Sequence, residues 1–389
     1  EMSASLVGSE MCIRDSKIVQ MNYDAIDAGA KQVVEVEVPE SWKSCEDEGL
    51  FSPEVKGGKE DVVNFVKNIQ TKVNAQEGNT LPVSAFNDYV DGSTPSGSSA
   101  YEKRGIAVDI PVWQSENCIQ CNRCAYVCPH AVIRPVVLTE EELAKAPEGT
   151  KAIDMIGMPG MKFTITVSAL DCTGCGSCAN VCPGKKGEKA LVMKSLEENA
   201  ASQEVFDFGR EIEVKPEVVA KFKPETVKGS QFKQPLLEFS GACAGCGETP
   251  YAKLVTQLFG DRMYIANATG CSSIWGNSSP STPYTVNAKG QGPAWGNSLF
   301  EDNAEFGYGM LLAQKAIRKR LKEEVEAVAA SDAASADVKV ACQEYLDTFN
   351  CGVSNGDATD KLVAALEGCD CDTCKDIVKN KDFLAKKSQ

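Results

Sequence analysis

Two cysteine-rich stretches decide how the rest of the chain is interpreted: NCIQCNRCAYVCPH at residues 117–130 and DCTGCGSCANVCPG at residues 171–184. Both contain the spacing C-x-x-C-x-x-C-x-x-x-C-P, which is typical of bacterial iron–sulfur proteins. The two-residue steps let three thiolates wrap one cluster, whereas the fourth cysteine points away toward the cluster of the other half. Because the two stretches also share Cys-Ala-x-Val-Cys-Pro, they indicate an internal duplication.

The crossing of the fourth cysteine predicts two 4Fe–4S clusters and assigns eight thiolates to them. The first expected ligand set is Cys118, Cys121, Cys124 and Cys182. The second expected set is Cys172, Cys175, Cys178 and Cys128. The proline after each crossing cysteine stops the short helix there.

Zinc and disulfides are the alternatives for so many cysteines. Zinc sites use ligands in pairs, often with histidine, and the repeated run of four cysteines does not fit that pattern. Disulfides require an oxidising compartment, and we recognise no secretory signal in the sequence. The spacing therefore favours iron–sulfur clusters over both alternatives.

The composition narrows the classes of function. The chain has 389 residues, of which 43% are hydrophobic, so two or three domains with real cores are expected. No apolar run approaches the length of a membrane span, which predicts a soluble protein. The formal net charge of −15 argues against nucleic-acid binding. It would not attract an acidic electron carrier either, so docking of one would need a local basic patch.

The chain contains a single histidine, His130, which follows a predicted cluster cysteine. One histidine cannot build a nucleophile–base array or a histidine-based zinc site unaided. We therefore expect His130 to be a packing or solvated residue, and no catalytic residue is assigned.

The N-terminal hundred residues carry weaker signals. Residues 1–16 show neither periodicity nor continuity with the residues after them, so we interpret them, with Cys12, as an assembly scar. Residues 17–100 are predicted to be the tail of an upstream domain and a linker. Within them, KQVVEVEVP at 31–39 alternates like a half-buried strand, and the apolar spacing over 60–73 predicts an amphipathic helix.

Residues 101–196 are predicted to form a ferredoxin-type domain. Each half consists of a strand, a cluster loop, a short helix and a second strand, which is a βαβ unit with a pseudo-twofold relation to the other half. The strands are expected at 107–113, 131–138, 162–170 and 190–196. The segment 139–160 is an insertion that is expected to cover a cluster or dock on a neighbour. On spacing alone, Tyr101-Glu102-Lys103-Arg104 is a solvated charge cluster.

After the clusters, residues 197–240 are charged and rich in proline, and we expect them to tether two domains across a surface. Residues 241–389 then begin an α/β domain. A helix is predicted from Thr249 onward, with an apolar face made of Tyr251, Leu254, Val255 and Leu258. The strand after this helix ends near Cys271, a position where ligands bind in open α/β sheets.

The remainder alternates between loop and helix signals. Residues 276–310 have neither strand nor helix period but are rich in glycine, asparagine and aromatics, which favours an ordered active-site loop. Helices are expected at 305–329 and 337–349. Three cysteines close together near the C-terminus, Cys369, Cys371 and Cys374, could hold zinc. However, we expect no metal site there because a fourth nearby ligand is missing.

At these residues the chain closely resembles the pyruvate:ferredoxin oxidoreductase family, from about residue 17 to residue 389. The motifs that carry the resemblance are Tyr101-Glu102-Lys103-Arg104, both cysteine–proline motifs, GACAGCGETPY at 241–251 and the stretch IANATGCSSIWGNSS to GYGM at 265–310. The last of these is the most specific.

The resemblance implies the fold class and the cofactors. It implies a multidomain α/β and α+β protein, in which the di-cluster ferredoxin domain precedes the first part of a thiamine-diphosphate-binding domain. Cys243, Cys246 and Cys271 match three ligands of a third 4Fe–4S cluster, whose fourth ligand lies downstream in the family. Glu248 and Cys271 match contacts to thiamine diphosphate. The family's Gly-Asp-Gly motif for magnesium has no match here.

The resemblance also implies the reaction of the parent enzyme: pyruvate and coenzyme A give acetyl-CoA and CO2, and electrons pass to ferredoxin or flavodoxin. A cytoplasmic homodimer from anaerobic metabolism is implied, with no membrane or nucleic-acid partner. Because upstream and downstream motifs of the family are missing, we expect this chain to be an internal fragment that cannot turn over pyruvate alone.

Three alternatives remain open from the sequence. The chain could be a polyferredoxin-like electron-transfer module without a catalytic role, although the 241–310 stretch argues against this. It could belong to another 2-oxoacid:ferredoxin oxidoreductase of the same superfamily. A zinc-stapled structural protein is the third alternative, which the cysteine spacing disfavours.

Overall fold

The computed structural model describes residues 16–44, 55, 57–278 and 281–387. The chain divides into two compact units, residues 1–52 and 53–389. The predicted scar at 1–16, with Cys12, lies outside the described residues except for Ser16, which begins the first described helix. Within the described ranges, no helix combines the length and apolar character that crossing a bilayer requires.

The first unit contains helix α3 (Ser16–Lys31) and a short 3-10 helix (Glu40–Ser44), and neither has a buried residue. The strand predicted over 31–39 is wrong. Residues 32–39 have no regular secondary structure, and Val33 and Val36 remain 80% and 73% exposed. Alternation provides an apolar face, but a strand also needs a neighbouring edge, and none of the described residues pairs with this segment.

The second unit begins with a helix that the sequence predicted. It comprises α4 (Glu60–Phe65), a π-helical turn (Val66–Gln70) and α5 (Thr71–Asn74), and its buried residues include Val62, Phe65, Val66 and Ile69. Three 3-10 helices come next, at Gly78–Thr80, Val83–Tyr89 and Ser98–Tyr101.

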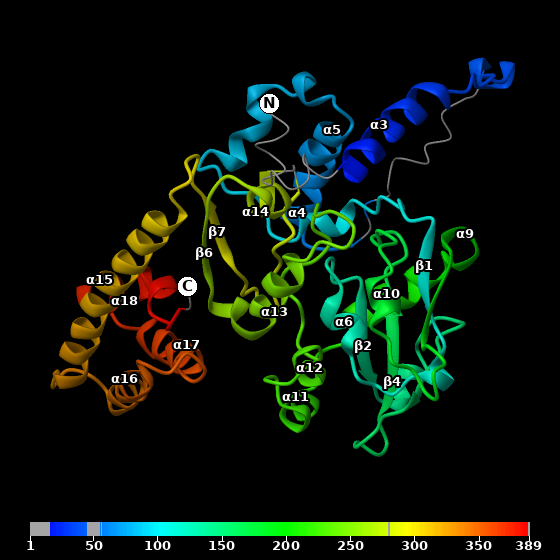
Figure 1. The fold of residues 1–389 in the computed structure, drawn as a ribbon. Helices are drawn as coiled ribbons and strands as arrows, with labels where there is room; N and C mark the ends of the chain where they lie inside the picture. The colour runs from blue at the N-terminus through cyan, green and yellow to red at the C-terminus, as the bar shows by residue number, and fades with distance from the viewer. Residues whose placement is uncertain (1–15, 45–54, 56, 279–280, 388–389) are drawn as a thin grey trace. The chain divides into compact units, whose positions relative to one another are not determined.

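The duplicated motifs form the central domain, whose halves have the same order of elements. The first half contains β1 (Asp109–Trp113), α6 (Arg123–Val127) and β2 (Ile133–Leu138). The second half contains β4 (Lys162–Val167), α8 (Ser177–Asn180) and β5 (Leu191–Ser195). Strand β1 pairs antiparallel with β5, and α6 contacts α8. Strand β2 pairs antiparallel with β4, beside which it lies in Figure 1. The four predicted strands and the pseudo-twofold arrangement are confirmed.

The insertion between the halves packs on the first cluster loop. It contains α7 (Glu140–Leu143), whose Thr139 and Glu142 form a capping box, and β3 (Ile153–Asp154), which adds to the outer edge of β4. The Gln120 side chain donates to the Asp154 carbonyl at 2.8 Å and accepts from the Ile156 amide at 2.9 Å. The insertion therefore supports the loop that precedes Cys121.

Residues 197–240 are more than a surface tether, contrary to the expectation. They form α9 (Leu196–Asn199), α10 (Ser202–Glu211), α11 (Pro216–Phe222) and α12 (Val227–Ser230). Helix α10 packs on β4 and β2, and Phe206, Val218, Phe232 and Phe239 are buried in the core of the ferredoxin-type domain. The sequence does not reveal these helices, because each of them contributes at most two apolar residues to the core.

A small parallel sheet comes next, made of β6 (Tyr264–Asn267) and β7 (Ala294–Asn297). Helix α13 (Thr249–Phe259) and a 3-10 turn (Gly260–Arg262) precede it, and α14 (Cys271–Ser273) and a π-helical turn (Ile274–Ser278) separate its strands. The strand predicted before Cys271 is confirmed. The prediction that 276–310 lacks a strand is wrong, because Ala294-Trp295-Gly296-Asn297 pairs with β6 despite its glycine.

Helix α13 presents to the interior a different face from the one predicted. Its buried residues are Thr249, Lys253, Thr256 and Gln257, whereas Tyr251 of the apolar face is 72% exposed. The helix contacts α6 and α12, and its buried polar side chains hydrogen-bond to backbone carbonyls and polar side chains of the neighbouring segments. Gln257, for example, donates to the Lys233 carbonyl at 2.9 Å and accepts from the Gln231 amide group at 3.0 Å.

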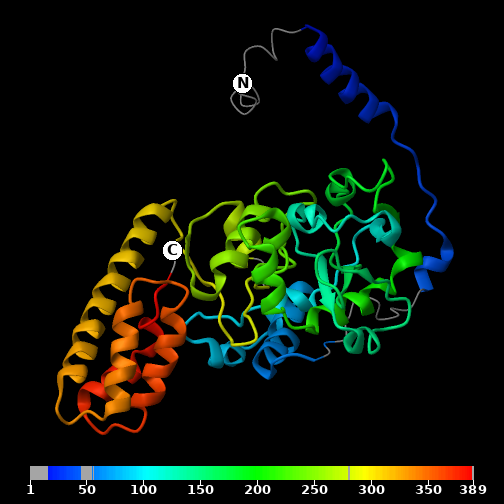
Figure 2. The same ribbon diagram turned by 90° about the horizontal axis from the view of Figure 1, so that it is seen from below.

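Four helices end the chain: α15 (Asn303–Ala330), α16 (Ala336–Thr348), α17 (Asn355–Leu366) and α18 (Asp372–Lys379), with a 3-10 turn (Lys381–Phe383) after them. The first two were predicted and the last two were not. The helices lie side by side in Figures 1 and 2 and share one hydrophobic core, which includes Leu321, Tyr345, Leu362 and Ile377. Helix α15 also packs on β6.

Candidate metal-cluster sites

The first group of thiols comes from both motifs. One cavity is lined by Cys118, Cys121, Cys124 and Cys182. Burial raises the pKa of Cys124, and the charges of Cys118, Cys121 and Cys182 raise it further. Apolar side chains of the two strand pairs, Trp113, Ile165 and Leu191, line the same cavity. Three cysteines of the first loop therefore face the last cysteine of the second motif.

The second group mirrors the first. Burial raises the pKa of Cys178, and the charges of Cys128, Cys124, Cys172 and Cys175 act in the same direction. Burial also raises the pKa of Cys172 to about 12, with a smaller contribution from Cys128. Cys128 thus lies with the second loop rather than with its own. Because Cys124 influences Cys178, the two thiol groups approach each other where α6 meets α8.

Backbone amides point at the sulfurs of these groups. The Gln120 amide donates to Cys118 Sγ at 3.4 Å, and the Gly174 amide donates to Cys172 Sγ at 3.4 Å. The Ala190 amide donates to Cys182 Sγ at 3.3 Å. N–H···S bonds to cluster ligands are one of the means by which proteins tune iron–sulfur potentials.

The third motif lies directly against the second cluster loop. Cys243 and Cys246 lie on the loop that precedes α13, and the position of a Cβ on Gly245 would be 3.7 Å from Cys175 Cβ. His130 anchors this loop, because its Nε2 hydrogen-bonds to the Ala242 carbonyl at 2.8 Å. Of the two roles expected for His130, packing or solvated, the structure shows the first, because the side chain is buried.

Cys271 begins α14, and it is exposed like Cys243. The two segments that carry them share a small core made of Leu237, Trp275 and Tyr284, against which Ala242 and Trp295 pack. Glu248 is exposed at the start of α13, and its charge contributes to the raised pKa of Tyr284, after burial of the tyrosine itself. Sequence reasoning placed these residues in one region, and the structure links their segments through this core.

Lys253 is a residue that the sequence analysis missed. It is 2% exposed, and its Nζ donates to the carbonyls of Ala125, Tyr126 and Cys128, the last two at 3.2 and 3.1 Å. Burial lowers the pKa of Lys253 to about 8. A lysine of α13 thus caps the C-terminal end of α6, beside Cys128. The polar stripe Thr249–Lys253–Thr256 at helical spacing was the signal that could have revealed it.

The charge cluster at 101–104 is only partly solvated, contrary to the expectation. Lys103 Nζ pairs with Asp171 Oδ2 at 2.5 Å, and the carboxylate side chain is 5% exposed. Asp171 also accepts from Ser168 Oγ at 2.6 Å and immediately precedes Cys172. Lys103 therefore fixes, through its ion pair with Asp171, the residue at which the second cluster loop begins.

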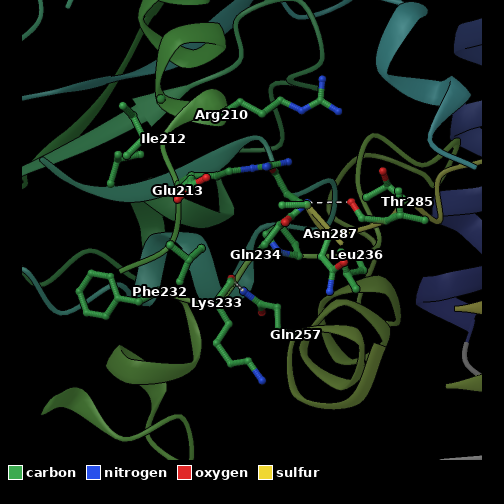
Figure 3. Close-up of a pocket in the computed structure, with 18 of the residues that line it drawn as sticks. Arg210, Ile212, Glu213, Phe232, Lys233, Gln234, Leu236, Gln257, Thr285 and Asn287 are labelled. Carbon is green, nitrogen blue, oxygen red and sulfur yellow. Dashed lines mark hydrogen bonds between the residues drawn. The ribbon is translucent and has the colours of Figure 1, made fainter. Parts of the chain in front are cut away.

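A further cavity is separate from the thiols. Its volume is about 780 Å³, and it lies between the end of α10, the segment 231–236 and the segment 285–289. Figure 3 shows Arg210, Glu213, Lys233 and Asn287 around it. None of the eleven predicted ligand cysteines lines this cavity. Its polar side chains and backbone groups also contact one another, as in the 3.1 Å bond from the Thr285 amide to the Leu236 carbonyl.

Two family profiles match the chain. Residues 53–107 match a domain of unknown function that includes Glu102-Lys103-Arg104, and residues 117–186 match a 4Fe–4S dicluster domain. The latter range contains all eight cysteines of the two thiol groups.

Comparison with curated proteins gives long matches. The chain is 53% identical to the pyruvate-flavodoxin oxidoreductase of Enterobacter agglomerans over 314 residues, which are 81% of this chain and 26% of the relative. It is 50% identical to the pyruvate:ferredoxin oxidoreductase of Moorella thermoacetica over 387 residues, which are 96% of this chain and 32% of the relative. It is also 47% identical over 332 residues, 79% of this chain and 17% of the relative, to a pyruvate dehydrogenase [NADP(+)] of Cryptosporidium parvum.

The chain therefore spans about a quarter to a third of the length of the first two relatives. The matches agree with the cysteine spacing and with the duplicated fold. The chain is homologous over most of its length to a segment of the pyruvate:ferredoxin and pyruvate-flavodoxin oxidoreductases, and it carries a 4Fe–4S dicluster domain.

Proposed function

We propose that this chain is the electron-transfer segment of an enzyme that oxidatively decarboxylates pyruvate. Cys118, Cys121, Cys124 and Cys182 would hold one 4Fe–4S cluster, and Cys172, Cys175, Cys178 and Cys128 would hold a second. The observation that carries the proposal is the exchange of the fourth cysteine between the two halves.

The chemistry of the donor sets supports this assignment. Each group offers four thiols, of which all but Cys121 in the first and Cys175 in the second belong to the apolar core. Backbone amides donate to three of the sulfurs. Burial raises the pKa of Cys118, Cys124, Cys172 and Cys178. Because the thiolate is the ligand, these residues would release their protons when a cluster binds. When bound, a 4Fe–4S cluster accepts and releases one electron at a time.

The residues of the chain would set the conditions for that transfer. The strand pairs bury Cys118, Cys128, Cys172 and Cys178, and the buried Lys253 donates to the Cys128 carbonyl. Burial, hydrogen bonds to sulfur and local charge are the levers by which a protein adjusts a cluster potential. Because α6 contacts α8, the two proposed sites would be neighbours, as transfer in series requires.

Residues 241–389 would form part of the thiamine-diphosphate-binding domain. Cys243, Cys246 and Cys271 would hold three corners of a third cluster, and Glu248 and Cys271 would contact the thiamine cofactor, which supplies an electron sink for the carbanion. The exposure of Cys243 and Cys271 fits a site that further residues complete. The fourth ligand and the magnesium ligands would come from elsewhere in the enzyme.

Of the domain boundaries expected from the sequence, we keep 17–100 as the tail of an upstream domain and linker, and 101–196 as the ferredoxin-type domain. Residues 197–240 would complete the core of that domain as well as connect it to the thiamine domain. The partners of the whole enzyme would be pyruvate, coenzyme A and a ferredoxin or flavodoxin. A cytoplasmic homodimer without nucleic-acid or membrane partners is part of the same proposal.

The test begins with anaerobic reconstitution, and then iron, sulfide and EPR analysis of the reduced protein. About eight irons per chain, in two interacting clusters, support the proposal, and about twelve would mean that the third site also fills. Reoxidation of the reduced chain by ferredoxin or flavodoxin, measured by stopped-flow absorbance, supports the electron-transfer role. Little iron with bound zinc would overturn it.

Paired variants test the crossing of the ligands. In Cys121→Ser/Cys182→Ser both changes fall on one proposed set, so about four irons should remain. In Cys175→Ser/Cys182→Ser the changes fall on different sets, so both clusters should be lost. The opposite pattern would contradict the crossing. Cys342→Ser, a buried thiol of the helical region, is the control and should keep both clusters.

A further inference from the structure

Three cysteines in the C-terminal helices converge although they belong to neither thiol group. Cys369, Cys371 and Cys374 place their sulfurs within 4.8 Å of one another, and Cys369 Sγ is 3.5 Å from Cys371 Sγ. Among the residues that the structure describes, they form the only set of three or more potential metal-binding atoms that is so compact. The sequence analysis expected no metal site here, and it could not show that the three thiols face one another.

Local structure explains the convergence. Cys369 lies in the turn after α17, Cys371 is the N-cap of α18, and Cys374 lies in the first turn of that helix. As the N-cap, Cys371 accepts a hydrogen bond with its side chain from the backbone amide of Cys374, three positions later. Cys374 and Cys369 also pack in the core of the four helices, which fixes two of the three sulfurs.

The three cysteines resemble the cluster loops in having a backbone amide that donates to a sulfur, and they differ from them in how closely their sulfurs lie together. The Cys374 amide donates to Cys371 Sγ at 3.2 Å, as the Gln120 and Gly174 amides do to Cys118 and Cys172. The three sulfurs, however, crowd around a space of the size of one ion, because they are all neighbours within 4.8 Å. This spacing fits thiolates that share a single cation at a metal–sulfur distance of about 2.3 Å.

We propose that Cys369, Cys371 and Cys374 bind one thiophilic d10 cation, Zn²⁺ or Cu⁺. Thiolates select these ions over harder cations. Three thiolates complete a trigonal site for Cu⁺, whereas Zn²⁺ would take water as a fourth ligand on the side where Cys371 is exposed. This site is independent of the proposed clusters, because it lies in a different hydrophobic core.

Binding would join the α17–α18 turn to the first turn of α18. Without a cation, that junction is held by the contacts of Cys374 and Cys369 with the helical core and by an exposed ion pair between Lys375 and Asp370. A cation that binds only the folded helices stabilises them by mass action. The chain would therefore have a metal site that stabilises structure, beside clusters that transfer electrons.

The test uses the whole chain, reconstituted anaerobically and carrying Cys243→Ser, Cys246→Ser and Cys271→Ser so that the thiols proposed for the third cluster cannot compete. Zn²⁺ is titrated against a chromophoric chelator, and Cu⁺ against a copper(I)-specific chelator. We expect one equivalent of one of these ions to be retained, and Co²⁺ to give the sulfur-to-metal absorption of a thiolate site. The two titrations decide between Zn²⁺ and Cu⁺.

Adding Cys369→Ser should weaken binding at least tenfold. This position lies outside α18, so the N-cap that Cys371 provides is kept. Cys342→Ser and Cys351→Ser, which change other thiols of the same helical region, should leave binding unchanged. The proposal is overturned if the chain retains neither ion, if Cys369→Ser retains it fully, or if mass spectrometry of the anaerobic protein finds a Cys371–Cys374 disulfide.

Discussion

The two cluster loops reach the same backbone shape with different residues. At the second and fourth positions after the first cysteine, both loops adopt a left-handed conformation. The φ angles are +57° and +60° at Gln120 and Asn122, and +68° and +73° at Gly174 and Gly176. Glycine reaches this region without penalty, whereas other residues are held there only by their surroundings.

The surroundings of the first loop supply those restraints. Gln120 and Asn122 are each 1% exposed. Gln120 bonds to Asp154 and Ile156 of the insertion, and Asn122 Nδ2 donates to the Lys228 carbonyl at 2.9 Å. The insertion and α12 thus hold the first loop from outside, which gives these two segments a structural role in the first site.

The second loop is shaped by lack of space instead. A Cβ on Gly174 would lie 3.1 Å from the Asp109 carbonyl and 3.3 Å from Ala107 Cβ. Gly245 of the third motif approaches Cys175 on the same loop. The two copies of a duplicated site can therefore keep one backbone shape by different means. The first loop uses polar side chains that are hydrogen-bonded to other segments, whereas the second uses glycines and is approached closely by the third motif.

The largest difference between the two sites is expected from Gly174→Ala. Left-handed backbone alone costs alanine about 1–2 kcal/mol, and the close approach to Asp109 adds a steric cost. The second cluster should be lost selectively, as measured by iron content and by loss of the EPR coupling between the clusters. Gly176→Ala is the matched control, because its Cβ would meet nothing within 4 Å. Equal losses in both variants would contradict the role of crowding.

Lys103→Met should also affect the second site more than the first. It leaves the buried Asp171 carboxylate without its ion pair, which we expect to cost about 2 kcal/mol because Lys103 is itself partly exposed. Iron release to a chelator should accelerate in one of its two phases. Lys162→Met removes the exposed pair with Asp154 near the first loop and serves as the control. If both phases accelerated equally, the selective role of Lys103 would be wrong.

Gln120 offers a smaller and more specific test of the first loop. Gln120→Ala loses two hydrogen bonds and keeps the left-handed strain, so we expect a loss of about 2 kcal/mol in the stability of the first site. Gln120→Gly loses the same bonds but relieves the strain, so its loss should be about 1 kcal/mol less. Urea unfolding of the loaded protein measures both variants. A glycine variant as unstable as the alanine variant would show that strain is unimportant there.

Glu238→Gln should lower the free energy of unfolding at neutral pH. Glu238 is 2% exposed and pairs with Arg134 and with Arg210, and these charges hold its pKa below the ordinary range although burial opposes them. A lowered pKa gives stability that is full above the ordinary glutamate pKa and is lost as the pH falls through the folded-state value. The difference in the free energy of unfolding between the wild type and the variant should therefore shrink as the pH falls. A difference that does not change with pH would count against the ionised network.

The ferredoxin-type domain was the most predictable part of the fold. Its cysteine spacing fixes two loops, and the strands that flank them are rich in β-branched residues. The helices of residues 197–240 were missed because they add few apolar residues each. The buried face of α13 was mistaken because Lys253 and Gln257 find carbonyl partners that only the fold supplies. β7 and the convergence of Cys369, Cys371 and Cys374 likewise depend on contacts that the sequence does not display.

The exposed apolar side chains on α13 and on the segments after β7 have a consequence for how the chain behaves in solution. Tyr251 of α13 is 72% exposed, and Leu299, Phe300 and, in α15, Tyr308 are also largely exposed. Apolar side chains favour self-association, whereas a net charge of −15 opposes it by repulsion between molecules. Salt screens the repulsion and leaves the apolar contacts intact. Light scattering should therefore detect more association as ionic strength rises, the reverse of what is expected where complementary charges hold molecules together.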